Sequence, residues 1–262
     1  MFIKDYEDFK TEIYKMSGIN LSLYKEKQMK RRIESLMKKN NFDSYNDYTN
    51  TLKTNKILYN EFINYLTINV SEFYRNPGQW EVLQKEIIPL LLSKSKTLKI
   101  WSAACSTGEE PYSLVMVLTN FFPLPSIKII ATDIDKEALA KANIGLYNPK
   151  SLEGVPKENI AKFFTKEGDF FKIKDEVKKC VEFSQHNLLK DSYPSNCDLI
   201  VCRNVLIYFT EEAKSEIYMK FNQALKTEGV LFVGSTEQII LPNRYNLAPI
   251  KTFFYQKIKS LV

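Results

Sequence analysis

Residues 101–114 read WSAACSTGEEPYSL, and residues 131–135 read ATDID. The first segment continues an apolar run, turns at a serine, a threonine and a glycine, and opens a helix at Glu109 or Glu110. The second ends another apolar run on Asp133. A strand, a turn, a helix and a second strand that ends on an acid form an adenosine pocket in a doubly wound α/β sheet, where the acid holds the ribose hydroxyls.

The same turn argues against a dinucleotide ligand. A dinucleotide site needs several glycines and a helix N-terminus that receives the pyrophosphate. Here a single glycine, Gly108, precedes Glu109 and Glu110, whose carboxylates repel an anion. We therefore expect an adenosine that carries a cation, such as S-adenosylmethionine with its sulfonium and ammonium groups. The alternative is an ordinary capped helix in which Ser106 and Thr107 precede two first-turn acids.

Composition restricts the class of protein. A chain of 262 residues with 44% hydrophobic and 26% charged residues is typical of a globular protein with one large or two smaller domains. No apolar run approaches the roughly 18 residues of a membrane span, and the charged N-terminus is not a signal peptide. Four cysteines without C-x-x-C spacing then predict reduced thiols in a cytoplasmic protein. His186 is the only histidine, which argues against a histidine-based metal site or a Ser-His-Asp triad.

The secondary-structure pattern changes once along the chain. Residues 1–70 show apolar positions at helical spacing in four segments, which predicts an all-helical N-terminal domain. Residues 71–80 contain the turn signal Asn-Pro-Gly and predict a linker. Residues 81–262 alternate strands and helices, which predicts a doubly wound, Rossmann-like α/β domain. The pattern loosens at about residues 147–180 and predicts a small β insertion.

Three predictions within the α/β domain are specific. Residues 136–144 predict a helix after ATDID. Residues 210–229 read TEEAKSEIYMKFNQALKTEG and predict a capped amphipathic helix that ends at Gly229. Residues 250–258 read IKTFFYQKI and predict a single last strand.

Five motifs in one order identify a family. NVSEFYRNP follows the helical domain, and STGEEPYS, ATDID, HNLL and CRNVLIYF come after it. In this order the chain resembles the chemotaxis receptor glutamate methyltransferases, the CheR family, over nearly its whole length. Ser71 and Tyr74 stand where the family usually has threonine and phenylalanine, and they keep the hydroxyl and the aromatic ring. The resemblance implies a methyltransferase that depends on S-adenosylmethionine and releases S-adenosylhomocysteine.

The resemblance also implies roles for individual residues. The residues implied to bind the cofactor are Asn69, Ser71, Arg75, Glu110, Asp133, Asn187, Leu188, Arg203 and Asn204. Arg75 and Tyr208 are implied to be catalytic, because both would lie beside the methyl group and guide the acceptor carboxylate. The structural alternatives are a surface arginine at a domain junction for Arg75, a first-turn acid for Glu110 and a core tyrosine for Tyr208.

The implied reaction forms a γ-glutamyl methyl ester on a receptor and so sets sensory adaptation. A glutamate with a reference pKa of about 4.3 is already ionised at pH 7, so the enzyme needs no general base. The net charge of +6 suits an acidic partner, but also nucleic acid. A nucleic-acid methyltransferase of the amino-methylating kind would usually carry a proline pair, which CRNVLIYF lacks, and a non-catalytic S-adenosylmethionine-binding scaffold is the other alternative.

A basic predicted helix is the expected partner surface. Its cations are Lys25, Lys27, Lys30, Arg31, Arg32, Lys38 and Lys39. We expect them at exposed positions, where they would face the acidic cytoplasmic helical bundle of the receptor. The alternative is a solvated charged face without a partner. Neither nucleic acid nor insertion into the membrane is expected.

Overall fold

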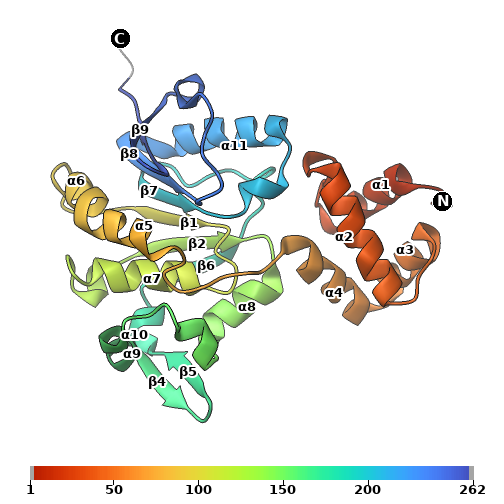
Figure 1. The fold of residues 1–262 in the computed structure, drawn as a ribbon, viewed down its shortest axis with the longest axis horizontal. Helices are drawn as coiled ribbons and strands as arrows, with labels where there is room; N and C mark the ends of the chain where they lie inside the picture. The colour runs from red at the N-terminus through yellow and green to blue at the C-terminus, as the bar shows by residue number, and fades with distance from the viewer. Residues whose placement is uncertain (1–2, 260–262) are drawn as a thin grey trace. The chain divides into compact units, whose positions relative to one another are not determined.

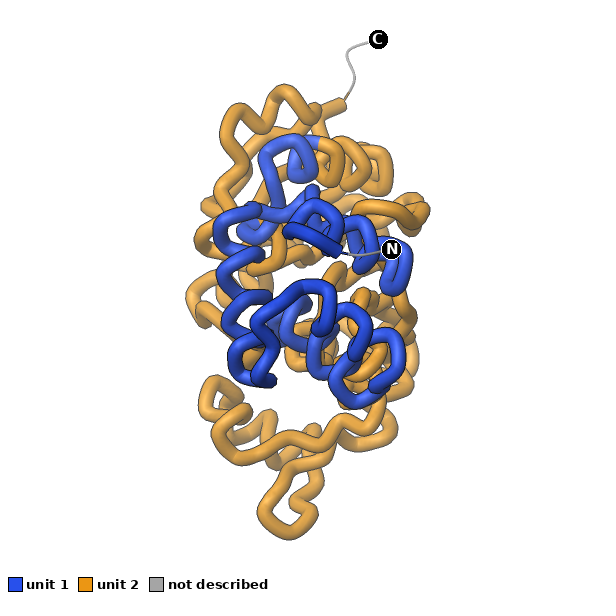
Figure 2. The backbone as a smooth tube through the Cα atoms, turned by 90° about the vertical axis from the view of Figure 1, so that its right-hand side faces the viewer, with its two compact units in different colours: residues 1–69, 207–215 blue, residues 70–206, 216–262 orange. Residues whose placement is uncertain are grey.

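The structure is a computed structural model that describes residues 3–259, and it separates into two compact units (Figure 2). The helical unit comprises residues 1–69 and 207–215, and the sheet unit comprises residues 70–206 and 216–262. The outer ends of the two predicted domains, residues 1–2 and 260–262, lie outside the described residues.

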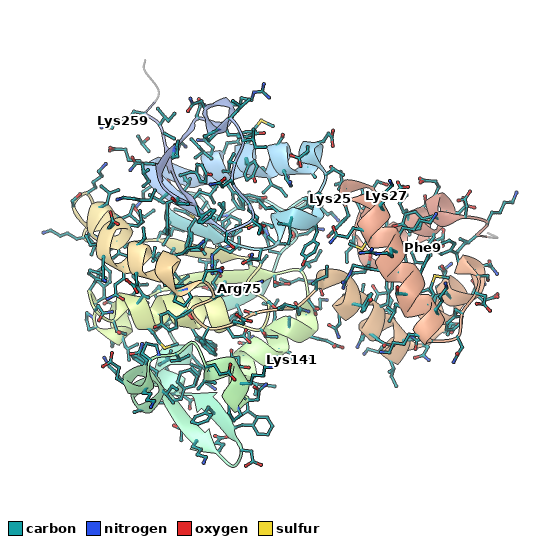
Figure 3. All side chains as sticks on the ribbon, viewed as in Figure 1. Phe9, Lys25, Lys27, Arg75, Lys141 and Lys259 are labelled. Atoms are coloured by element: carbon teal, nitrogen blue, oxygen red, sulfur yellow. The ribbon has the colours of Figure 1, made fainter. Side chains whose placement is uncertain are left out.

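The helical unit is built from four amphipathic helices with clear sequence boundaries. Asp5, Ser44 and Asn55 accept hydrogen bonds from backbone N–H groups at three of the helix starts, and Gly18 ends the first helix in the left-handed conformation. Phe9 is fully buried among the rings of the unit (Figure 3). The helices are α1 (Tyr6–Ser17), α2 (Glu26–Lys39), α3 (Tyr45–Thr54) and α4 (Lys56–Thr67), with 3-10 turns η1 (Leu21–Leu23) and η5 (Leu206–Tyr208), the latter shared with the sheet unit.

The sheet unit contains a seven-stranded sheet of order β6-β2-β1-β7-β8-β10-β9 (Figure 1). The first five strands in this order pair in parallel, and the last two pairings are antiparallel. Ile100 of β1 pairs with Ile129 on one side and Leu199 on the other. The strands are β1 (Ile100–Ala103), β2 (Ile129–Asp133), β6 (Val181–Gln185), β7 (Cys197–Cys202), β8 (Leu225–Val233), β9 (Leu247–Lys251) and β10 (Phe254–Lys257).

The chain order reverses at β1, which has β2 on one side and β7 on the other. In open α/β sheets, ligands bind at such a switch point, beyond the carboxyl ends of the strands. The helices of this unit are α5 (Pro77–Val82), the π-helical turn η2 (Leu83–Ile87), α6 (Ile88–Leu92), α7 (Glu109–Leu118), α8 (Lys136–Ile144), α9 (Lys157–Phe163), α10 (Asp175–Lys178) and α11 (Glu211–Ala224). The start of α11, up to residue 215, is counted with the helical unit. The 3-10 turns are η3 (Leu124–Ser126), η4 (Pro149–Leu152) and η6 (Pro242–Tyr245). No helix among residues 3–259 combines the length and apolar character that a bilayer crossing requires.

A three-stranded antiparallel sheet of order β3-β5-β4 interrupts the parallel pattern. Its strands are β3 (Leu146–Tyr147), β4 (Phe164–Glu167) and β5 (Phe170–Ile173). A helical domain, a mostly parallel sheet and this small β insertion confirm the predicted fold class.

Two predicted elements near the C-terminus are wrong. The helix expected to reach Gly229 ends at Ala224, because Leu225 is buried and pairs with Cys197 of β7. Gly229 is needed for close packing instead, since a Cβ atom there would lie 2.8 Å from the carbonyl oxygen of Cys197. The single last strand is a pair of antiparallel strands, β9 and β10, that reverses at Phe253 with φ of +69°.

Candidate active site

The loop after β1 is a tight turn with a left-handed backbone at three positions. Ala104, Ser106 and Gly108 have φ of +65°, +49° and +95°, the region that L-residues rarely adopt. At Gly108 a Cβ atom would lie 2.9 Å from the Cβ of Ala142 and 3.0 Å from the Tyr147 hydroxyl. The glycine therefore lets this loop pack directly onto its neighbours before α7 begins.

Asp133 braces this loop from the end of β2. Its carboxylate accepts hydrogen bonds from the backbone N–H of Ser106 at 2.8 Å and of Asp135 at 2.9 Å. The residue is buried, and burial raises the pKa of its carboxyl group to about 6. Asp133 thus ties together the loops that follow two adjacent strands.

Glu110 and Arg203 form a buried acid–base pair at the switch point. Glu110 lies in the first turn of α7, where its carboxylate accepts from the Ser102 hydroxyl at 2.8 Å. Arg203 directly follows β7, and its Nη1 lies 3.7 Å from Glu110 Oε2. Burial raises the pKa of Glu110 to about 7, although the charge of Arg203 opposes the shift.

The segment that begins at residue 71 and runs into the first turn of α5 is held in place along its length; we refer to residues 71–80 as the active-site linker. Phe73 is buried, with its ring centroid 4.9 Å from that of Tyr147 and 5.4 Å from that of Phe164. The Tyr74 N–H donates to the Ser113 hydroxyl of α7 at 3.1 Å. A Cβ atom at Gly154 would lie 2.7 Å from the Phe73 carbonyl oxygen, so the β insertion meets the linker backbone directly.

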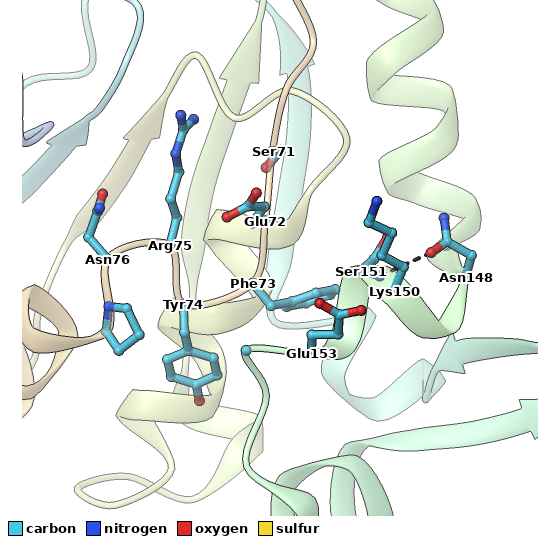
Figure 4. A pocket seen from close by; sticks show the side chains of 12 residues that line it. Ser71, Glu72, Phe73, Tyr74, Arg75, Asn76, Asn148, Lys150, Ser151 and Glu153 are labelled. Atoms are coloured by element: carbon cyan, nitrogen blue, oxygen red, sulfur yellow. Dashed lines mark hydrogen bonds between the residues drawn. The ribbon is translucent and has the colours of Figure 1, made fainter.

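Two pockets flank this linker. The smaller holds about 40 Å³ and is lined by Val70, Ser71, Glu72, Arg75, Ala104, Cys105, Ser106, Glu110, Arg203 and Asn204. The larger, which we call the linker groove, holds about 350 Å³ between residues 71–77 and residues 148–154 (Figure 4). Ser71, Glu72 and Arg75 line both.

The small pocket brings together five of the residues implied by the resemblance: Ser71, Arg75, Glu110, Arg203 and Asn204. Asp133 is one hydrogen bond away, through Ser106, but does not line the pocket. Asn187 and Leu188 lie in the turn after β6, where the Asn187 side chain accepts from the Leu189 N–H at 2.9 Å.

Two implied residues belong to the helical unit. Asn69 donates through its side-chain amide to the Thr67 hydroxyl at 3.1 Å. Tyr208 lies in a 3-10 turn, and its carbonyl accepts from the Lys25 N–H at 2.9 Å.

Sequence reasoning missed Glu237, which shapes the loop after β7. The side chain is buried and accepts from the N–H groups of Asn204 at 2.6 Å, Leu206 at 2.6 Å and Gly234 at 2.9 Å. Its only sequence signal is an acid three residues after Gly234 at the end of an apolar strand. A single acid of that kind does not reveal three backbone partners from two separate loops.

The expectation that all seven cations of the basic helix are exposed is wrong for two of them. Arg32 is half-buried, donates to the Tyr65 carbonyl at 2.7 Å and places its guanidinium 4.5 Å from the Tyr65 ring centroid. Lys30 is also half-buried, with its ammonium 5.5 Å from the Tyr6 ring centroid. Four cations are exposed and form no ion pair within residues 3–259: Lys25, Lys27, Arg31 and Lys38 (Figure 3 marks the first two, at the start of α2).

Comparisons with known proteins agree over almost the entire chain. The family model described as "CheR methyltransferase, all-alpha domain" matches residues 4–67, and "CheR methyltransferase, SAM binding domain" matches residues 69–254. The chain is 44% identical to a chemotaxis protein methyltransferase of Listeria innocua over 97% of both chains. It is 32% identical to a chemotaxis protein methyltransferase of Escherichia coli K12, over 90% of this chain and 85% of that protein.

Proposed function

Because the chain belongs to the CheR methyltransferase family, we propose that it transfers the methyl group of S-adenosylmethionine to glutamate side chains of chemotaxis receptors. The observation that carries this proposal is the small pocket at the sheet switch point, where Arg75 of the linker meets Glu110 and Arg203. Arg75, together with Ser71 and Glu72, lines both this pocket and the linker groove, so it can act at the cofactor position and at the acceptor position.

The donor set of the small pocket fits the amino-acid end of S-adenosylmethionine. Glu110 offers a buried carboxylate that can accept from an ammonium group. Arg203 Nε is a buried donor with no hydrogen-bond partner among residues 3–259, and it suits a carboxylate. A volume of about 40 Å³ matches such a small charged group rather than a whole nucleoside. We place the ribose near Asp133 and the adenine near Asn187 and Leu188.

The linker groove provides a route for the acceptor. A receptor segment in this groove would lie along residues 148–154 and reach Arg75, which also lines the cofactor pocket. Arg75 Nη1 donates to the Val70 carbonyl at 3.2 Å, and the guanidinium forms no ion pair within residues 3–259. It can therefore hold an incoming carboxylate.

When bound, the cofactor supplies an electrophilic methyl group on its sulfonium. The acceptor glutamate is ionised at neutral pH, so the chain needs to align its oxygen with the methyl–sulfur bond, not to remove a proton. We assign this alignment to Arg75, with Tyr208 as a second proposed contributor, and we retain Asn69 and Ser71 as proposed cofactor contacts. We therefore propose that residues 71–80 are a linker that contributes to the active site and that connects an N-terminal domain of residues 1–70 to a methyltransferase domain of residues 81–262.

The exposed cations of α2 are the proposed partner surface. Lys27, Arg31 and Lys38 are exposed and form no ion pair within residues 3–259, so an acidic receptor helix bundle can engage them. We also propose a cytoplasmic site of action, which the four free cysteines support.

One assay tests the proposal against its alternatives. Purified protein, radiolabelled S-adenosylmethionine and receptor-containing membranes should give methyl label in the receptor that alkaline hydrolysis releases, as for a glutamyl ester. Label in added nucleic acid would instead indicate a nucleic-acid methyltransferase. Tight binding of S-adenosylhomocysteine without label in any acceptor would indicate a scaffold.

A further inference from the structure

We propose that Arg203 is a positioning residue that uses one guanidinium to fix the active-site linker beside the cofactor pocket and to balance the charge of Glu110. This inference deepens the proposed function, on which it rests. It assigns Arg203 a role beyond lining the cofactor cleft, because its Nη2 atom donates to the linker and its Nη1 atom faces Glu110.

The first half of the role is mechanical. Arg203 Nη2 donates to the Arg75 carbonyl at 2.6 Å, to Asn76 Oδ1 at 3.1 Å and to Gln79 Oε1 at 3.0 Å. The same Arg75 carbonyl accepts from Trp80 Nε1 at 3.0 Å. The backbone of the residue proposed to hold the acceptor is therefore tied to the end of β7.

The second half of the role is electrostatic. Arg203 Nη1 faces Glu110 at 3.7 Å, and both side chains are buried. Arg75 also favours ionisation of Glu110, whereas Glu237 disfavours it. The thiols of Cys105 and Cys202 interact electrostatically with Glu110. Because burial raises the pKa of both thiols, they stay neutral at pH 7 and add no charge beside Glu110. Among the groups around Glu110, Arg203 does most to favour its ionisation and so opposes the effect of burial.

Only arginine can make both sets of contacts. Its planar group presents donors in fixed directions, so one edge can face the linker while another faces an acid. The apolar environment holds that plane, since the guanidinium carbon lies 4.8 Å from the Phe232 ring centroid and 5.6 Å from that of Trp80. A lysine would keep the charge near Glu110 but could not span the linker acceptors.

Three variants separate the two halves. In Arg203→Lys we expect kcat to fall on the order of 100-fold, the cost of misplacing a reacting group by about 1 Å, while the affinity for S-adenosylhomocysteine, weakened by loss of the Nε donor, keeps the wild-type pH dependence. In Arg203→Met we expect the same loss together with a cofactor affinity at least about tenfold weaker at pH 7 that recovers in part at higher pH, because Glu110 then ionises at higher pH while the lost Nε donor is not restored. The double variant Asn76→Ala/Gln79→Ala should lower kcat without changing the pH dependence of binding.

Two measurements make the test independent of receptor activity. Hydrogen exchange of residues 71–80 should be faster in Arg203→Lys and in the Asn76/Gln79 variant than in the wild type. Calorimetry should measure the affinity for S-adenosylhomocysteine at several pH values between 6 and 9.5. The midpoint of this pH dependence should be higher than in the wild type only in Arg203→Met. Glu110→Gln is the control, because the pH dependence that remains in it comes from titration of the ligand itself.

Each half can fail separately. Wild-type exchange of residues 71–80 in both linker-directed variants would overturn the mechanical half, and an unchanged midpoint in Arg203→Met would overturn the electrostatic half. Wild-type protein that binds S-adenosylhomocysteine but does not methylate receptors would overturn the proposed function, while the exchange and binding results would still decide the role of Arg203. If Arg203→Met fails to fold, Arg203→Lys and the Asn76/Gln79 variant still test the linker. The charge is then tested by comparing Arg203→Lys with the wild type and with Glu110→Gln. The pH midpoint of S-adenosylhomocysteine binding should be the same in Arg203→Lys and in the wild type.

Discussion

Arg203 donates a hydrogen bond of 2.6 Å to the carbonyl oxygen of Arg75, although 128 positions separate the two residues in the chain. The contact joins the linker to the strand β7 in the middle of the sheet. Arg75 is thereby presented by a fixed backbone, and its side chain is left to act on a ligand.

Arg75→Ala should lose receptor methylation far more than it loses stability. The side chain is half-buried and, among residues 3–259, its hydrogen bond is the 3.2 Å one to the Val70 carbonyl, so its removal leaves no core cavity. Arg75→Lys is the matched variant, since it keeps the charge but not the planar fork. Methylation rate and thermal melting, measured on the same variants, distinguish a role in holding the acceptor from a structural role. A normal rate, or a protein that simply unfolds, would remove Arg75 from the mechanism.

Asp133→Ala should weaken S-adenosylhomocysteine binding by about 1–3 kcal/mol, the range for a lost hydrogen bond to a charged group. Because the carboxylate also accepts from Ser106 and Asp135, the variant should melt at a lower temperature than the wild type. Asp135→Ala is the comparison, since it removes the N-cap of α8 without touching the Ser106 bond. Calorimetry that shows equal affinity in Asp133→Ala and wild type would remove Asp133 from the ribose site.

The buried carboxyl of Glu110 should make stability fall as pH rises. A group whose pKa in the folded state exceeds its unfolded value stabilises the fold below the unfolded value and loses that contribution as pH rises through the folded one. For Glu110 this window runs from its ordinary value of 4.5 to about 7. Between pH 4.5 and pH 8, the melting temperature of the wild type should therefore fall relative to that of Glu110→Gln. Parallel profiles would show that Glu110 does not titrate in this window.

Gly108→Ala should destabilise the fold by about 1–3 kcal/mol, the usual range for a strained backbone position. The residue combines φ of +95° with neighbours that leave no room for a Cβ atom. Gly78→Ala is the matched control, because Gly78 lies in α5 with open space around it and no left-handed φ. It should be neutral or slightly stabilising by up to about 1 kcal/mol. Chemical denaturation of the two variants compares them directly, and equal losses would argue against the steric explanation.

The sequence predicts local structure here much better than it predicts contacts across the chain. The helix expected over residues 136–144 is observed at Lys136–Ile144, because Asp135 caps its start and Gly145 ends it in the left-handed conformation. The helix expected to end at Gly229 is wrong, because a glycine required by packing looks the same as a glycine that ends a helix. Likewise, the three linker acceptors of Arg203 are visible only once β7 and residues 75–79 are brought together.

Opposite charges line the same side of the linker groove and should affect receptor methylation in opposite directions. Lys150 and Glu153 are exposed, and neither forms an ion pair among residues 3–259. Against an acidic receptor segment, Lys150→Glu should raise KM and Glu153→Lys should lower it, because each changes the charge that the segment meets. Affinity for S-adenosylhomocysteine should stay constant in both. Two variants with the same KM as the wild type at low salt would place the receptor outside this groove.

Charge reversal on the exposed face of α2 should slow receptor methylation while cofactor binding stays intact. The test variant is Lys27→Glu/Arg31→Glu/Lys38→Glu, whose three side chains are exposed and form no ion pair among the described residues. Long-range attraction to an acidic bundle acts mainly on the association rate and is screened by salt. The loss in kcat/KM should therefore be largest at low ionic strength and shrink as salt is added.

Arg32→Glu is the structural comparison. Because Arg32 donates a hydrogen bond to the Tyr65 carbonyl, this variant should lower the melting temperature, whereas the triple variant should not. Equal methylation by wild type and triple variant at low salt would show that this face of α2 is only solvated.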